Sequence, residues 1–220
     1  MSFQAAAYLR KATSRAKSDV ANKLIGMFLH EVSRKISVSL ELNVADPRYT
    51  SVVVAKFASS CCYCRIPLEN DRAAVEHLDG MNRFQAGLHI PGNVILSCKK
   101  CNNEKRRDDQ LHELKLAKSG WESFLSHDST KCVVECKTCA YWKSVWPDEM
   151  QRNENLKQSR NCIMEFRAGF RQAIRLGRKA KPSLHQELER LYRECQVFAT
   201  DHIKGSVEQV VLDLGIQMRR

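Results

Sequence analysis

Features that place a protein in or beyond a membrane are missing from this chain of 220 residues. It has no stretch of about 18 consecutive apolar residues, so we expect no transmembrane helix. The N-terminal segment, MSFQAAAYLRKATSRAKSDV, lacks the apolar core that signal peptides carry, which argues against secretion. A mitochondrial presequence stays open because the segment is acid-poor, although it continues as an ordinary amphipathic helix. We therefore expect an intracellular, cytoplasmic protein.

Internal repeats are also absent, and acidic residues are too few to balance the basic ones. The net charge is +11, which favours a polyanionic partner. The excess is uneven, because residues 155–181 contain eight Lys or Arg and a single acid, Glu165. Hydrophobic residues make up 43% of the chain, which is enough for a packed core and argues against disorder. The length of 220 residues predicts one domain with additions or two small domains.

Hydrophobic spacing in the N-terminal part changes its period once. Apolar residues recur at three- and four-residue steps through residues 3–34, which predicts a helix. Residues 36–44 alternate apolar and polar side chains, which predicts a half-buried strand. Asp46-Pro47 then indicates a turn, and residues 49–57 the return strand. A helix and a β-hairpin are thus expected over residues 1–58.

The central part, residues 59–120, predicts two strands and a helix. The strands are expected at Ala73–Leu78 and Asn93–Ser97, and the helix from Cys101 to about Lys118. The third region, residues 121–220, opens with a Cys/Trp-rich segment and continues as helices. The first helix is expected from Glu149 to about Leu176, and a basic linker follows at residues 177–182. A second helix is expected to begin at a capping box at Ser183, and a third at Ser206.

Ten cysteines in an intracellular chain need an explanation other than disulfides, which are rare in the cytosol. Two Cys-x-x-Cys pairs have the spacing of a structural zinc clamp, in which four thiolates surround one tetrahedral ion: Cys61/Cys64 and Cys98/Cys101. Cys62 is left as a spare thiol. A second, weaker group could hold another zinc or could be thiols of a small hydrophobic core: His127, Cys132, Cys136 and Cys139.

The residues between and after the two knuckles resemble a known enzyme family. Glu76-His77, then Asn93, then Cys101-Asn102-x-x-Lys105 is similar to the pattern of the HNH endonucleases of the ββα-metal class, in the zinc-stapled subgroup. The resemblance covers Cys61 to Asp109. It implies an α+β fold, with a ββα-metal core stapled by a four-cysteine zinc and flanked by helices, and it suggests a bacterial protein.

The resemblance also implies a role for each motif residue. His77 would take the proton of the attacking water, as a neutral imidazole can near pH 7. Glu76 and Asn102 would hold one catalytic Mg²⁺ or Mn²⁺, with Asn103 as the alternative ligand if the helix register differs by one. Asn93 would hydrogen-bond across the loop and set the backbone that carries His77.

Basic side chains in two places are expected to contact DNA phosphates. Near the motif these are Arg83, Lys105 and Arg107. Farther along, five arginines would form one stripe on a helix: Arg160, Arg167, Arg171, Arg175 and Arg178. Five neutralised phosphates give a log–log salt slope of about −4.5, whereas a merely solvated basic face gives none.

These expectations predict a metal-dependent DNA endonuclease, of restriction or phage-defence type and acting as a homodimer on double-stranded DNA. Within the class, a nicking or homing-type enzyme is the alternative. A nuclease subunit activated by a partner protein, and a non-catalytic zinc protein that binds DNA, also stay open. The recognition sequence and any dependence on DNA modification are not given by these residues.

Overall fold

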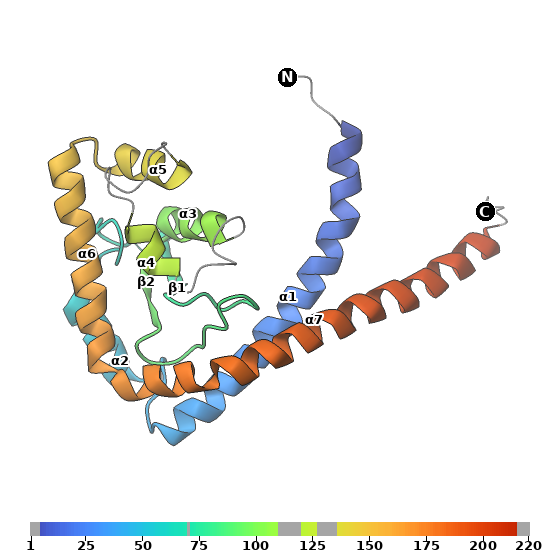
Figure 1. Cartoon of the computed structure of the whole chain (residues 1–220), viewed down its shortest axis with the longest axis horizontal. Coiled ribbons are helices and arrows are strands. Elements are labelled where there is room, and N and C mark those ends of the chain that lie inside the picture. Colours follow the sequence, from blue (N-terminus) through green and yellow to red (C-terminus); the bar gives the residue numbers. More distant parts are fainter. Residues whose placement is uncertain (1–4, 70, 110–119, 127–135, 215–220) are drawn as a thin grey trace.

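The computed structural model describes residues 5–69, 71–109, 120–126 and 136–214. Figure 1 shows a body with a small sheet, from which two long helices extend after crossing each other. The elements are α1 (Ala5–Ser39), α2 (Pro47–Phe57), β1 (Ala73–His77), β2 (Val94–Cys98), α3 (Lys99–Asp109), α4 (Gly120–Leu125), α5 (Lys137–Val145), α6 (Glu149–Gly169) and α7 (Arg171–Asp213). The fold is α+β, as predicted.

The two strands predicted in the centre are confirmed. β1 and β2 pair antiparallel, with Glu76 opposite Ile95 and His77 opposite Val94. α3 begins at Lys99, directly after β2, so strand, loop, strand and helix follow one another as expected. The loop between the strands closes on itself through the backbone hydrogen bond from Leu78 to Asn93, 2.9 Å long.

The β-hairpin predicted before the first knuckle is wrong, because neither predicted strand forms: residues 36–39 are helical, residues 40–44 are turn and irregular backbone, and residues 49–57 are helical. Residues 36–39 continue α1, and Ile36 and, just beyond the helix, Leu40 lie four positions apart and pack against buried residues of α1, α7 and the loop between the strands. Residues 49–57 form α2, whose buried residues Tyr49, Val53 and Phe57 also recur every fourth position. Packing along one face therefore overrides the β-branched character of both segments.

The Asp46-Pro47 pair starts α2 instead of forming a hairpin turn. The Asp46 side chain accepts a hydrogen bond from the Arg48 backbone N–H, and Pro47 occupies the first helical turn. Both are ordinary features of a helix N-terminus, where proline loses no hydrogen bond. α2 ends at Ala58, which is left-handed with φ 49°.

The C-terminal helices also divide at a different place than predicted. The helix expected from Glu149 to Leu176 breaks at Phe170, which has φ −118° and ψ 36°. The predicted linker at 177–182 and the predicted helix starts at Ser183 and Ser206 all lie inside α7. Gly177 has a packing role there, because a Cβ at this position would lie 3.2 Å from Ile90 Cδ1.

Two hydrophobic cores hold the molecule together. The first packs α2, the sheet, the knuckles and α4–α6, and includes residues from all three predicted regions. The second packs α1 and α7 against the loop at Ala86–Ile90. The loop also approaches the α6–α7 corner, where a Cβ on Gly92 would lie 2.7 Å from Phe170 Cβ. The loop between the strands therefore joins the two cores.

Among the described residues, no helix is both long enough and apolar enough to cross a membrane.

Candidate metal centre and catalytic site

The four cysteines of the two knuckles come together where β2 ends and α3 begins. The sulfur atoms of Cys61, Cys64, Cys98 and Cys101 all lie within 4.8 Å of one another, and all four residues are buried. Thiolates at ~2.3 Å from a tetrahedral zinc lie about 3.8 Å apart, and the Cys64 and Cys98 Sγ atoms are 3.7 Å apart. The group can therefore hold a metal ion such as zinc.

Neighbouring groups support these sulfurs. The Cys101 backbone N–H donates to Cys98 Sγ at 3.3 Å, and the Tyr141 hydroxyl contacts Cys101 Sγ at 2.9 Å. Hydrogen bonds from the other thiols, that of Cys101 first, lower the pKa of Cys61 far below its usual range. Cys62 is buried beside this group, and its burial raises the pKa of its thiol. Hydrogen bonds to ligand atoms of this kind orient metal ligands.

Glu76 and Asn102, expected to hold a catalytic cation, are brought together by β1 and α3. The Asn102 side-chain amide donates to Glu76 Oε2 at 3.0 Å. On the other side, Lys105 Nζ lies 2.6 Å from Glu76 Oε1 and donates to the His77 carbonyl at 2.8 Å. Glu76 and Lys105 are 2% and 3% exposed. The carboxylate is thus neutralised inside the protein by a lysine.

Asn93 makes the cross-loop hydrogen bonds expected of it. Its amide donates to the carbonyls of Asp79 (3.0 Å) and Leu88 (2.8 Å), and its oxygen accepts from the Asp79 backbone N–H at 2.8 Å. Asn93 is 2% exposed, so these bonds are made in a dry environment where they matter most. They fix the chain just after His77.

His77, at the end of β1, meets a second histidine, His89, from the loop between the strands. Its Nε2 lies 2.9 Å from Nδ1 of His89, and the ring of His30 on α1 lies 5.0 Å from that of His89. Burial first, and then the charge of His30, lower the pKa of His89. From the sequence, His89 is either an ordinary loop histidine or a substrate contact, because nothing in its local pattern reports the contact with His77, 12 residues away.

Three of the side chains expected to contact DNA phosphates are instead engaged with partners inside the protein. Lys105 is buried against Glu76. Arg83 lies between the rings of Phe84 and Tyr192 and pairs with Glu189 at 3.2 Å, tying the loop to α7. Arg167 on α6 is only 10% exposed and pairs with Asp79 at 2.9 Å, which ties the loop between β1 and β2 to α6. The Arg107 side chain lies outside the described residues.

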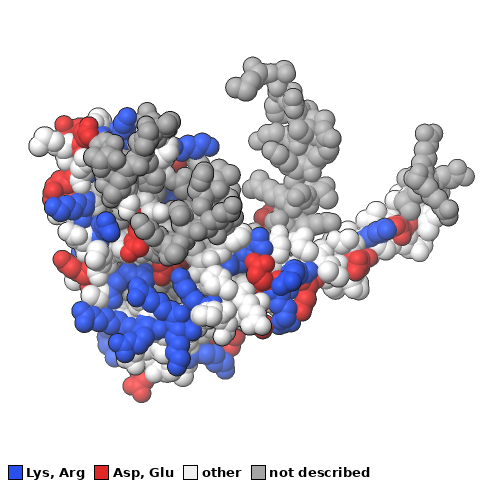
Figure 2. All heavy atoms as spheres, viewed as in Figure 1, with Lys and Arg blue, Asp and Glu red and all other residues white. Residues whose placement is uncertain are grey.

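The other arginines of the expected stripe remain on the surface, but on two helices. Arg160 lies on α6, and Arg171, Arg175 and Arg178 lie on α7, on either side of the break at Phe170. Within the described part of the chain, no ion pair neutralises any of the four, and Glu165 pairs with Lys56 at 2.5 Å. Figure 2 shows Lys and Arg gathered low on the body, where α6 meets α7 in Figure 1. We call these four residues the basic corner.

The second cysteine group is described only in part. Cys136 caps α5, and its Sγ accepts from the Cys139 backbone N–H at 3.4 Å, a contact typical of a knuckle turn. His127 and Cys132 lie outside the described residues. The adjacent rings of Phe124, Tyr141 and Trp142 pack in the first core.

Comparison with known proteins adds no relative. No family model, curated protein or solved structure matches the chain.

Proposed function

We propose that the protein is a metal-dependent DNA endonuclease of the HNH class. The observations that carry the proposal are that the four-cysteine group ties the segment before β1 to β2 and α3, and that Asn102 on α3 donates to Glu76, the residue next to His77 in β1. Two motif residues that are 26 positions apart in the sequence, Glu76 and Asn102, are thus in direct contact, and the third, His77, is the next residue of the strand. We further propose that the ion in the four-cysteine group is a structural zinc.

His77 is the proposed general base. An imidazole accepts a proton from water near neutral pH, and general-base catalysis of this kind contributes about 10²–10⁴-fold to a rate. Asn93 would act through the backbone by holding the turn that follows His77. The same turn is braced by Arg167 through Asp79, so the base is carried on a rigid part of the chain.

The proposed catalytic cation would be held by Glu76 and Asn102. A carboxylate and an amide oxygen suit Mg²⁺ or Mn²⁺ chemically. As placed, however, the Glu76 carboxylate is buried and bound to Lys105 and to the amide nitrogen of Asn102, so the pair does not present an open oxygen site. The proposed metal dependence therefore rests on the motif.

DNA is the proposed substrate because a polyanion fits the basic corner, whose cations have no ion-pair partner among the described residues. Phosphate contacts by Arg160, Arg171, Arg175 and Arg178 would position the duplex without reading its sequence. With Arg167 removed from the set, four contacts predict a log–log salt slope of about −3.6. A homodimer or a protein partner is also proposed, and the exposed apolar residues late in α7, Ile203, Val207 and Val210, offer a surface for either.

A restriction or phage-defence role is our first proposal, and a nicking or homing-type nuclease the second. The test is incubation of supercoiled and linear DNA with zinc-loaded protein and Mg²⁺ or Mn²⁺, with EDTA as control. Linear products from supercoiled DNA would indicate double-strand cutting, and nicked circles would indicate a nicking enzyme. Discrete bands would indicate a sequence-specific enzyme. Absence of cutting by folded protein, with or without cell extract, would contradict the proposal, whereas activity only with extract would indicate an activating partner.

A further inference from the structure

The contact between His77 and His89 crosses the boundary between the two cores. His77 ends β1, whose partner strand contributes Ile95 to the first core. His89 lies between Leu88 and Ile90, which are buried in the second core with α1 and α7. Their ring nitrogens are nevertheless 2.9 Å apart. A loop residue whose two neighbours are buried in the second core thus contacts the His77 ring.

We propose that His89 is a positioning residue for His77, fixing the orientation and tautomer of its ring, and that α1 holds His89 in place through Ser33. This inference rests on the proposed role of His77 as a base. In that role, Nδ1 of His77 must accept the proton of water, so its Nε2 must carry a hydrogen. His89 Nδ1, at hydrogen-bond distance, is the acceptor that stabilises this tautomer.

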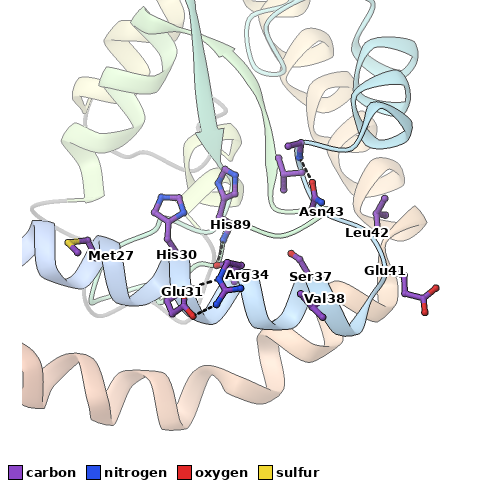
Figure 3. Close-up of a pocket in the computed structure, with 13 residues that line it drawn as sticks. Met27, His30, Glu31, Arg34, Ser37, Val38, Glu41, Leu42, Asn43 and His89 are labelled. Atoms are coloured by element: carbon purple, nitrogen blue, oxygen red, sulfur yellow. Dashed lines mark hydrogen bonds and ion pairs between the residues drawn. The ribbon is translucent and has the colours of Figure 1, made fainter.

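α1 fixes His89 from the opposite side. The His89 backbone N–H donates to the Ser33 hydroxyl at 2.8 Å, and this buried hydroxyl donates to the Leu29 carbonyl one turn earlier. Figure 3 shows the His89 ring beyond α1, beside the ring of His30 and below the end of a strand. Backbone and ring are therefore both restrained, as a hydrogen-bond acceptor that sets a tautomer must be.

Burial supports the same assignment. The half-buried ring of His89 has a lowered pKa, caused by desolvation and then by His30, so a neutral ring with a free lone pair is favoured. The charged groups facing it from α1 are Glu31 and Arg34, which pair with each other at 2.6 Å and do not contact His89. A neutral His89 can accept from His77 without adding a charge to the site.

Two pairs of variants test the proposal. His89→Leu removes the acceptor at similar size, whereas His89→Asn keeps a polar side-chain atom near the position of Nδ1. Ser33→Ala removes the tether from α1, whereas Ser39→Ala removes a hydroxyl that bonds to its own helix at Ile36 and faces solvent. Single-turnover cleavage at varied DNA concentration separates kcat from KM. Nitrogen-15 NMR of His77 reports its tautomer whether or not DNA is cut.

We expect His89→Leu to lower kcat about 10- to 100-fold, the range common for partners that orient a metal-ligating histidine, with KM unchanged. His89→Asn should recover most of this loss, Ser33→Ala should show a smaller one, and Ser39→Ala none. In wild type, His77 should be the Nε2–H tautomer, and His89→Leu should mix the two tautomers.

Two results would overturn the proposal: a His77 tautomer that does not depend on His89, or a loss in His89→Leu that lies in KM alone and so marks a DNA contact. If the wild-type protein cuts no DNA, the result contradicts the proposed nuclease function and not the role of His89. The tautomer measurement would then decide by itself whether His89 positions His77.

Discussion

Lys105 and Glu76 form a buried ion pair, with Nζ 2.6 Å from Oε1 and both side chains at most 3% exposed. The pair links α3 to β1 at the residue before His77, and the His77 carbonyl accepts a hydrogen bond from the same ammonium group. A charge inside a protein is tolerated only when it is paired and hydrogen-bonded. The charge of Lys105 therefore stabilises the site itself and does not serve the substrate.

Removing one partner of this pair should destabilise the fold. Lys105→Met leaves the Glu76 carboxylate buried without its counter-ion, and we expect the free energy of unfolding to fall by about 3–5 kcal/mol. Adding Glu76→Gln should restore part of the loss, since a neutral amide needs no counter-ion. Urea unfolding of zinc-loaded protein measures both. A single variant as stable as wild type would mean that the carboxylate is not confined as described.

Metal content should depend on the four clustered cysteines and not on their neighbour. We expect Cys98→Ser to lose tightly bound zinc and to unfold at a lower temperature, because binding energy at such sites is folding energy. Cys62→Ser changes a buried thiol next to Cys61 but outside the group, so it should keep its zinc. Native mass spectrometry gives the stoichiometry. Zinc loss in both variants, or in neither, would contradict the assignment.

The basic corner should set the salt dependence of DNA binding. Changing Arg171, Arg175 and Arg178 to Gln should make the log–log salt slope shallower by at most about 2.7, which is about 0.9 for each phosphate that the variant no longer neutralises. Arg190 and Arg193 lie farther along the same helix, and Arg190 pairs with Glu187 and Glu194, so their change to Gln serves as the control. Fluorescence anisotropy at several salt concentrations measures the slope. Equal effects of both sets would assign the dependence to net charge alone.

Burial of His89 should make stability fall as the solution becomes acidic. The folded pKa of His89 lies below the unfolded value of about 6.5. The unfolded chain therefore binds more protons between these two values, and the free energy of unfolding rises with pH through this window. The stability contributed by neutral His89 is complete above the unfolded pKa and is lost as pH falls through the folded pKa.

The corresponding measurement is urea unfolding at pH 7.5 and 5.5 for wild type and His89→Asn. The variant should show a smaller difference between the two conditions, because asparagine does not titrate. An unchanged difference would assign the acid sensitivity to other groups.

The sequence predicted the centre of the molecule better than its flanks. Knuckle spacing correctly groups Cys61, Cys64, Cys98 and Cys101. Glu76 lies on the first predicted strand, whereas Asn93, predicted to open the second, lies just before β2. By contrast, the run of valines in α2 predicts a strand, yet Val52 and Val54 are 45% and 43% exposed and Val53 is buried. Which face of that segment meets the core is decided by distant residues, among them Phe166 against Tyr49 and Phe57.

The environments of several site residues were predicted wrongly from the sequence, and these errors have one cause. Lys105 and Arg167 have the sequence context of surface cations, but their partners Glu76 and Asp79 lie 29 and 88 residues away in sequence. The role of His89 likewise depends on His77 and Ser33, from two other elements. A motif identifies which residues belong together, whereas burial and pairing of charges are properties of the packed structure.

The most direct test of the central claim is cleavage of plasmid DNA by His77→Ala. His202→Ala, on the exposed part of α7, is the matched control. With zinc content and thermal stability equal to wild type, we expect the first variant to lose at least about 100-fold in rate and the second to cut normally. Cutting by His77→Ala at the wild-type rate would contradict the account, since the site assembled around His77 would then not be the one that cleaves DNA.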